Sequence, residues 1–336
     1  MFQTDCHMTD ATKLFGNDFH CAPVVLLLFN RPDLTRRLLE RVRQIKPERL
    51  LVVADGPRSS VLTDAAACEE VQRLVRETVD WGARLDWNVA DSNMGIRKRV
   101  ASGLNWAFQL EQQVIVLEDD CLPELSFFPF CTELLDRYQN DTRVGLISGD
   151  NFQHGQEFTR ASYYFSRYAH IWGWASWRRA WNHYDDSMRD WPELRNSNWL
   201  AHLFPHPLEA LYWEKLFDEV SQHRIDTWDY AWQFALWTQS QYSILPAQNL
   251  ISNLGVGESA THTQDADKAK HQLEVSPMKF PLVHPSTVIR NHRADDYSQR
   301  THFGLAKDQS LIGRLVRMGE KARRLPQRAF RGKADS

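Results

Sequence analysis

The first 150 residues alternate between short apolar runs and longer stretches with helical spacing. Apolar runs of this kind predict strands that are buried on both faces, as in a parallel sheet. Such strands are predicted at residues 24–29, 50–54, 85–90, 114–117 and 144–147. Helices are predicted between them, at about residues 34–44, 61–79, 96–112 and 126–138. The alternation predicts an α/β fold with a mostly parallel central sheet flanked by helices.

The composition changes after residue 150. Ten of the thirteen tryptophans lie between Trp172 and Trp237, and most of them are expected to pack in a core. Gly173 lies between two of them, where a glycine allows backbone or ligand to approach closely. Further elements are predicted as helices near residues 207–222 and 228–239, a strand at 243–245, and irregular structure over 264–300.

The stretch VIVLEDDCLP, residues 114–123, places Glu118, Asp119 and Asp120 side by side at the end of a predicted buried strand. Adjacent like charges repel, most strongly where water is scarce, unless a positive charge lies among them. Open α/β sheets bind their ligands at this end of the strands. Carboxylates there can hold Mg²⁺ or Mn²⁺, which take oxygen ligands and leave room for substrate phosphates. The alternative is an exposed turn whose acids face the solvent.

Three cations, Arg97, Lys98 and Arg99, crowd the first turn of the helix that is predicted to begin at Ile96. Positive charge at a helix N-terminus opposes the helix macrodipole. A local conflict of this kind is typical of a site that holds an anion. The alternative is a surface helix whose first turn carries solvated arginines.

Composition and cysteine usage restrict the class of protein. The chain is 43% hydrophobic and 25% charged, as in an ordinary globular protein. Residues 1–22 do not resemble a secretory signal, and the apolar run at 24–29 is too short to span a bilayer. The five cysteines form no C-x-x-C pair, which favours free thiols over disulfides or a zinc site. The cytoplasm is therefore the expected compartment.

The formal net charge of −3 conceals a basic C-terminal tail. Residues 311–333 carry eight basic residues against one acid, and their apolar residues recur at three- and four-residue steps. A basic amphipathic helix is typical of a surface element that is attracted to anionic lipid. Docking on the protein's own acidic body is the alternative. Because the rest of the chain is acidic, nucleic acid is not an expected partner.

Seven motifs, taken in order, resemble nucleotide-sugar glycosyltransferases of the GT-A fold. They lie within residues 23–263 and read VVLLLFNRP, VVADGPR, SNMGIRKRV, VIVLEDDCLP, WGWASWRRAW, TWDYAWQFALW and LISNLGVGESATHT. Within this fold, the motifs resemble the bacterial glycosyltransferase family 2-like group, some members of which are called hemolytic protein HlpA-like. The eukaryotic N-acetylglucosaminyltransferase that begins complex N-glycans is more distantly similar.

The resemblance implies an activity and a division of the chain. The activity is transfer of a sugar, with inversion, from a UDP-sugar to a glycan or lipid-linked acceptor in cell-surface polysaccharide synthesis, with Mn²⁺ or Mg²⁺ as cofactor. A peripheral position at the inner face of a membrane would suit such acceptors. The division is an N-terminal extension (1–22), a nucleotide-sugar-binding half (23–150), an acceptor half of the same domain (151–263), an irregular segment (264–305) and the basic tail (306–336).

The resemblance also implies roles for individual residues. The Glu-Asp-Asp run matches the family's DXD motif, in which Asp120 contacts the metal and Asp119 or Glu118 lies near the ribose or sugar. His262, in the last motif, would reach the metal or the diphosphate, although a lone histidine in a loop is more often simply exposed. The other residues implied to line the nucleotide-sugar cleft are Arg31, Asp55, Asn93, Arg97, Lys98, Gly173 and Trp174.

An inverting transferase needs a base that takes the proton of the attacking hydroxyl. Asp229 is the first candidate and Asp226 the second. The distant relative reads Trp-Asp-Asp-Trp where this chain has Trp228, Asp229 and Tyr230, so a shifted alignment would place a tyrosine at this position. The alternative for Asp229 is a carboxylate that stabilises the macrodipole at a helix start.

Two other functions compete with this interpretation. A sugar-phosphate nucleotidyltransferase shares the α/β nucleotide-binding layout, but it would carry a glycine-rich, basic loop after the first strand, where this chain has FNRPD at 29–33. A non-catalytic carbohydrate-binding protein would use the tryptophan-rich region as a sugar platform and would bind glycan without metal.

Overall fold

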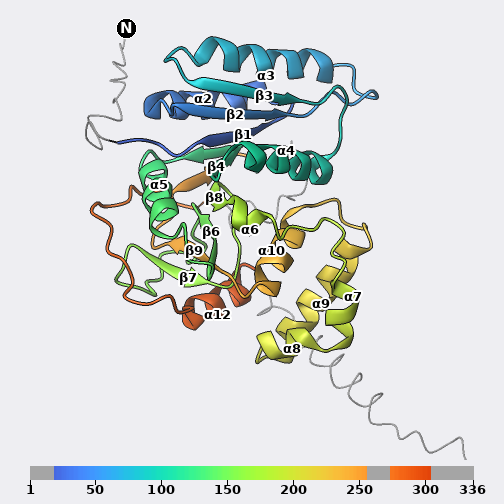
Figure 1. The fold of residues 1–336 in the computed structure, drawn as a ribbon, viewed down its shortest axis with the longest axis vertical. Helices are drawn as coiled ribbons and strands as arrows, with labels where there is room; N and C mark the ends of the chain where they lie inside the picture. Colours follow the sequence, from blue (N-terminus) through green and yellow to red (C-terminus); the bar gives the residue numbers. More distant parts are fainter. Residues whose placement is uncertain (1–18, 256–272, 304–336) are drawn as a thin grey trace, which may run out of the picture.

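The computed structural model describes residues 19–255 and 273–303. Within them, an eight-stranded sheet has the order β3-β2-β1-β4-β8-β6-β9-β7 (Figure 1). Its strands are β1 (Val24–Leu28), β2 (Arg49–Ala54), β3 (Arg84–Val89), β4 (Gln113–Glu118), β6 (Val144–Ser148), β7 (Tyr163–Ser166), β8 (Trp174–Trp177) and β9 (Tyr242–Pro246). The pairs formed among β3, β2, β1 and β4 are parallel, and so is the pair of β6 with β9. Strand β8 runs antiparallel to β4 and β6, and β7 runs antiparallel to β9.

Helices lie on both faces of the sheet and in a separate lobe (Figure 1). They are α2 (Pro32–Ile45), α3 (Asp64–Thr78), α4 (Ile96–Leu110), α5 (Phe127–Arg137), α6 (Arg178–Trp181), α7 (Trp191–Asn196), α8 (Trp199–Leu203), α9 (Pro207–Ser221), α10 (Asp229–Thr238) and α12 (His292–Thr301). The lobe of α7, α8 and α9 is held by an aromatic cluster that includes residues of α10. The α/β fold with a mainly parallel central sheet, predicted from the sequence, is confirmed.

Strand β1 shows why its sequence is continuously apolar. Val24, Leu26 and Leu28 pack in the core between the sheet and helices α2, α3 and α5. Val25 and Leu27 point to the opposite face, where they pack with residues of α4, α6 and α10. Because alternate side chains of a strand point to opposite faces, a strand covered on both sides needs apolar residues at every position.

The strand order reverses at β1. From β1 the chain adds β2 and β3 on one side of the sheet and then returns to place β4 on the other side. Helices on opposite faces leave a crevice at the carboxyl ends of the strands at such a point, and open α/β sheets bind ligands there. The segments that follow β1 and β4 begin at Phe29 and Asp119, so the acidic run lies at the reversal.

Eight of the described elements fall outside the sequence prediction, among them strands β7 and β8 and the short helices α6, α7 and α8. Helix α12 lies in a segment whose polar composition predicts irregular structure. Two short strands, β5 (Cys121–Pro123) and β10 (Ile251–Asn253), form an antiparallel pair. Just after β10, the backbone N–H of Leu254 donates to the carbonyl oxygen of Asp120 over 2.8 Å, so the start of the last motif returns to the acidic run.

Several predictions concern residues outside the described ranges. The N-terminal extension up to residue 18, His262 and the basic tail from residue 304 lie there, and the expectations for them stay predictions. Among residues 19–255 and 273–303, none of the helices combines the length and the apolar character that a membrane crossing requires.

Candidate functional site

A cavity of about 300 Å³ opens at the reversal of the strand order. We call it the switch-point cavity. Its walls come from the ends of β1, β2 and β4, the start of α4 and the segment before α10. The residues predicted for the site that line it are Arg31, Asp55, Asn93, Glu118, Asp119 and Asp226.

Arg31 lies among the carboxylates of the acidic run. Its Nη1 is 2.8 Å from Oδ2 of Asp120 and 3.3 Å from Oδ1 of Asp119. This contact follows from the topology, because Arg31 follows β1 and the aspartates follow the neighbouring parallel strand β4. The positive charge of Arg31 therefore reduces the repulsion among the neighbouring carboxylates of the acidic run.

The charge at the acidic run is not fully balanced by this pair. Burial raises the pKa of Asp119 to about 7, against the lowering effect of Arg31. Burial and the charges of Asp120 and Asp119 raise the pKa of Glu118 well above its usual range. An added cation would favour the ionised forms of these carboxyl groups and lower both pKa values, so metal binding here would be coupled to the release of protons.

The donor atoms at this position suit a hard divalent cation. Within the described residues, no group of three histidine, cysteine or acidic side chains is arranged to hold a metal ion. Mg²⁺, however, is usually bound by one or two carboxylates together with substrate phosphates and water. Asp120, whose side chain is 15% exposed, could supply one such oxygen beside the cavity. The residues present therefore fit a metal that is shared with a phosphate-bearing substrate.

Asp55 organises the wall of the cavity at the end of β2. Its Oδ2 accepts a hydrogen bond from Nδ2 of Asn93 at 2.9 Å, and its Oδ1 accepts from the backbone N–H of Met94 at 3.0 Å. Burial raises the pKa of Asp55, although backbone hydrogen bonds from Met94 and Gly56 act in the opposite direction. Asp55 thus fixes the turn before α4.

A second polar group, which was not predicted, includes Arg58, one of the residues that line the cavity. Asp64, which is buried, accepts hydrogen bonds from Arg58 Nε at 2.6 Å and from Asn30 Nδ2 at 2.7 Å. The Arg58 guanidinium holds the pKa of Asp64 at about 2. Arg58 also lies over the ring of Phe29, 5.3 Å from its centroid. The turn signature DGP at 55–57 marks this loop but not the role of the arginine that follows it.

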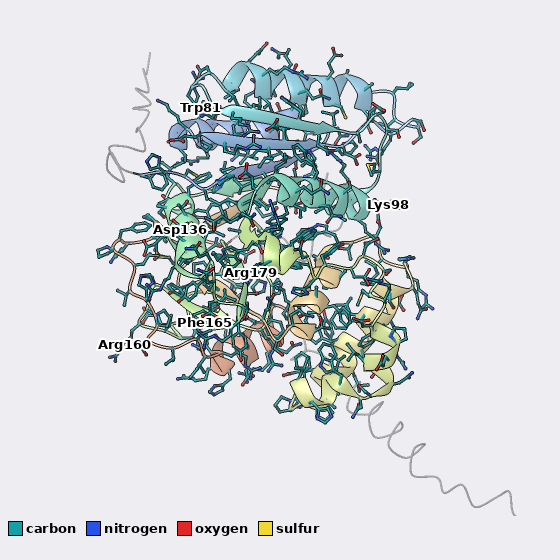
Figure 2. The ribbon with its side chains drawn as sticks, viewed as in Figure 1. Trp81, Lys98, Asp136, Arg160, Phe165 and Arg179 are labelled. Carbon is teal, nitrogen blue, oxygen red and sulfur yellow. The ribbon has the colours of Figure 1, made fainter. Side chains whose placement is uncertain are left out.

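The three cations of α4 separate in space. Arg97 is buried away from the cavity, where its Nε and Nη2 donate to the side chain and backbone carbonyl of Asp186 at 2.5 and 2.7 Å, and it contacts His223. Lys98 is exposed at the start of α4 (Figure 2). Arg99 instead lines the cavity. The structure therefore does not bring the predicted Arg97 and Lys98 to the cavity and places their neighbour there.

Helical spacing offers a signal for Arg99 but does not separate it from Arg97, since both are buried on α4. It lies four residues before Gly103, on the face of α4 that packs on the sheet. Gly103 is required there, because a Cβ would collide with the side chain of Val53. Arg99 is buried and donates from Nη2 to Oδ1 of Asn88 at 2.8 Å. An arginine on the apolar face of a helix is the signal that the sequence offered.

The pair Gly173 and Trp174, predicted for the pocket, lies elsewhere. Trp174 is fully buried and stacks on Trp228, with ring centroids 5.6 Å apart. Gly173 has φ +65° and packs against Ile251. Neither residue lines the switch-point cavity. Trp172 instead lines a second cavity, and its backbone N–H donates to Oδ2 of Asp150 at 3.0 Å.

Replacing Gly173 with alanine is expected to lower the free energy of unfolding by about 2–5 kcal/mol. The new Cβ would lie 2.6 Å from Cδ1 of Ile251, and the left-handed backbone adds about 1–2 kcal/mol of strain. Gly155→Ala is the matched control, because Gly155 has φ +78° with nothing within 4 Å of the added Cβ. Urea unfolding of both variants measures the difference. Equal losses would show that the contact with Ile251 has no effect.

The second cavity, of about 150 Å³, contains Asp229. We call it the aromatic cavity, and it is lined by Asp150, Phe152, Ala169, His170, Ile171, Trp172, Trp213, Asp229, Tyr230, Gln233, His302 and Phe303. Asp229 begins α10, and its Oδ1 accepts hydrogen bonds from the backbone N–H of Tyr230 and from Thr227 Oγ1. Burial raises the pKa of Tyr230 above its usual range, which makes this phenol a poor base.

The two candidate bases, three residues apart, line different cavities. Asp226 lines the switch-point cavity, where its Oδ2 lies 3.2 Å from the position a Cβ on Gly95 would take. Asp229 lines the aromatic cavity. The charge of Asp229 also contributes to the raised pKa of Glu118 on the other cavity. The segment 226–229 therefore borders both cavities.

Comparisons with known proteins establish no family. Neither a family model nor a curated protein matches the sequence. Solved structures with limited similarity include HddC from Yersinia pseudotuberculosis complexed with GMP-PN (10% identity, 47% of this chain, 78% of that chain, TM-score 0.30). A cytidylyltransferase from Leptospira borgpetersenii (12%, 61%, 73%, 0.30) and a UDP-glucose pyrophosphorylase complexed with UDP-glucose (9%, 48%, 78%, 0.29) are further examples. At these TM-scores the similarities carry no argument about function.

Proposed function

We propose that this protein is a glycosyltransferase that moves a sugar from a UDP-sugar to a hydroxyl of a glycan or lipid-linked acceptor. The observation that carries the proposal is the acidic run at the strand reversal, two of whose carboxyl groups line the switch-point cavity. A further carboxylate, Asp229, lines the aromatic cavity. One cavity suits a charged donor and the other an acceptor, and the segment 226–229 borders both.

The donor would occupy the switch-point cavity. Its uridine would lie near Asp55 and Asn93, and its diphosphate near Arg31 and the acidic run. Mn²⁺ or Mg²⁺, bound through Asp120, would supply positive charge to the diphosphate as it leaves. Arg31 is placed to interact with the same oxygens, because it already contacts Asp119 and Asp120.

The transfer itself would need one base. Asp229 takes the proton of the acceptor hydroxyl as its oxygen forms a bond to the anomeric carbon of the donor sugar. The bond from that carbon to the diphosphate oxygen breaks on the opposite side, and UDP leaves with the bonding electron pair. The product has inverted configuration at the anomeric carbon. In this proposal, residues 23–150 supply most of the donor site and residues 151–263 most of the acceptor site.

A donor screen tests the proposal. Each of a panel of UDP-sugars is incubated with the protein and Mn²⁺ or Mg²⁺, and the anomeric protons are followed by nuclear magnetic resonance. We expect slow hydrolysis of one UDP-sugar to UDP and free sugar, and this hydrolysis should stop when the metal is chelated. The absence of hydrolysis and of thermal stabilisation by every nucleotide sugar would contradict the proposal.

Two further assays separate the competing functions. Formation of a nucleotide sugar from UTP and a sugar 1-phosphate would identify a nucleotidyltransferase. Binding of glycan without metal and without turnover would identify a carbohydrate-binding protein. Synthesis of cell-surface polysaccharide at the cytoplasmic face of a membrane is the setting that we propose for the activity.

A further inference from the structure

We infer that the aromatic cavity binds one neutral sugar ring of the acceptor and that the segment after α12 forms its outer wall. This inference rests on the proposed function and deepens it. It specifies the class of acceptor, an uncharged pyranose, and it assigns part of the acceptor site to Phe303 and His302, which lie far along the chain from the sheet.

The walls of the aromatic cavity suit a pyranose. Phe152, Trp172 and Phe303 contribute aromatic rings, whose faces pack against the C–H groups of a sugar ring. The rings of Phe152 and Trp172 meet edge to face, with centroids 4.9 Å apart. Asp150 fixes this wall, because it accepts a hydrogen bond from the backbone of Trp172 and another from Ser148.

A buried histidine in the wall of this cavity has one ring nitrogen without a hydrogen-bond partner among the described residues. His170 lines the cavity and is 4% exposed, and its Nε2 forms no hydrogen bond within residues 19–255 and 273–303. Buried polar atoms are nearly always satisfied, so an unpaired one next to a cavity calls for an explanation. A hydroxyl group of a bound sugar would satisfy this nitrogen, as a donor or as an acceptor.

The acidic side chains that line the aromatic cavity favour a neutral ligand over an anionic one. Asp150 and Asp229 line the cavity, and none of its described lining residues is a lysine or arginine. A uronic acid or a phosphosugar placed here would face carboxylates without a compensating cation. An uncharged ring avoids this repulsion and keeps Asp229 within reach of one of its hydroxyl groups.

The outer wall is held in place by α12. Trp213 Nε1 donates to Oε1 of Gln299 at 3.3 Å, and Asp295 accepts a hydrogen bond from Ser166 in β7. These contacts bring the end of α12 to the cavity. There, the ring centroids of His302 and Phe152 are 4.0 Å apart.

Phe303 is the next residue after His302, and its ring centroid lies 5.1 Å from that of Trp213. Residues from the segments that follow β6 and β7, from α9 and α10, and from the segment after α12 thus form one cavity. A change in the segment after α12 would therefore alter acceptor binding without touching the donor site.

Saturation-transfer difference spectroscopy on the full chain tests this inference. The probes are methyl glycosides of glucose, galactose, mannose and N-acetylglucosamine, together with methyl glucuronide, in the absence of donor. We expect signals from at least one neutral glycoside and none from the glucuronide. In Phe303→Ala the affinity for that glycoside should fall at least tenfold, and it should fall in Phe303→Leu as well, which keeps apolar volume without a flat ring.

Tyr297→Ala is the matched control, because Tyr297 belongs to α12 but packs on Phe158, outside the aromatic cavity. This variant should retain wild-type affinity for the glycoside. Signals only from the glucuronide, no signals at all, or full affinity in both Phe303 variants would overturn the inference. If UDP-sugar hydrolysis persists in these cases, the inference alone fails. If glycosides bind but every UDP-sugar stays intact, the proposed function fails.

Discussion

Asp229→Asn is expected to lower kcat for sugar transfer by about 10²–10⁴-fold, the usual contribution of a general base. Asp229 lies in the aromatic cavity, away from the cavity in which the donor would bind. The KM for the UDP-sugar should therefore change little. Asparagine keeps the size of the side chain and can still accept the hydrogen bond from the backbone of Tyr230. Initial rates measured at varied donor concentration separate the two parameters.

Asp226→Asn is the matched control for this prediction. Asp226 lies only three residues away but lines the switch-point cavity, so its replacement should affect the KM for the donor more than kcat. A large loss of kcat in Asp226→Asn with normal turnover in Asp229→Asn would show that the assignment of the base is wrong. Loss of fold stability in Asp229→Asn without a kinetic effect would support the alternative role, stabilisation of the start of α10.

Asp120→Asn should abolish the stabilisation of the protein by UDP-sugar and Mn²⁺ and lower kcat/KM by at least about 10²-fold. The substitution removes the carboxylate proposed to contact the metal and one partner of Arg31. The thermal midpoint, measured with and without metal and donor, reports binding independently of turnover.

Asp86→Asn is a suitable control for Asp120→Asn. Asp86 also pairs with an arginine, Arg49, but it lies on β3, away from the residues that line the switch-point cavity. Both substitutions remove an arginine–carboxylate pair, so both affect stability by about 0–1 kcal/mol where the pair is partly exposed. Only Asp120→Asn should lose the ligand-dependent shift. An unchanged shift in Asp120→Asn would exclude this residue from the metal site.

Six of the eight strands of the main sheet, and the longer helices other than α12, could be predicted because their signals are local. The apolar run at β1 and the helical spacing of α2 depend only on which faces are covered. The short strands β5 and β10 could not be predicted in this way. They pair residues more than 120 positions apart, and three apolar or polar residues carry no periodic pattern.

Which residues line the cavities depends on how the elements pack together, and the sequence indicates this packing only indirectly. The acidic run could be placed at a strand end, and the structure brings Arg31, Asp55 and Asn93 to the same cavity. The choice among neighbours could not be made, because one residue along α4 rotates the side chain by roughly 100°. Arg99 therefore lines the cavity, whereas Arg97 pairs with Asp186.

The aromatic cavity illustrates the same point for tryptophans. Trp172 and Trp174 lie on either side of a glycine with positive φ, and of the two only Trp172 lines the aromatic cavity. Because both residues are tryptophans, residue type alone does not predict which of them lines a cavity. The outer wall depends on α12, whose sequence is polar because only one of its faces packs on the protein. Long-range packing of this kind leaves no strong signal in the composition of the segment.

The most direct test of the central claim is a crystal structure of the protein with a UDP-sugar and Mn²⁺, in which the manganese is located by its anomalous scattering. We expect one manganese at coordination distance from Asp120 and from the diphosphate, with the uracil or ribose beside Asp55 in the switch-point cavity. A nucleotide sugar bound outside this cavity, or manganese bound away from Asp120, would contradict the claim that the acidic run at the strand reversal is the donor site.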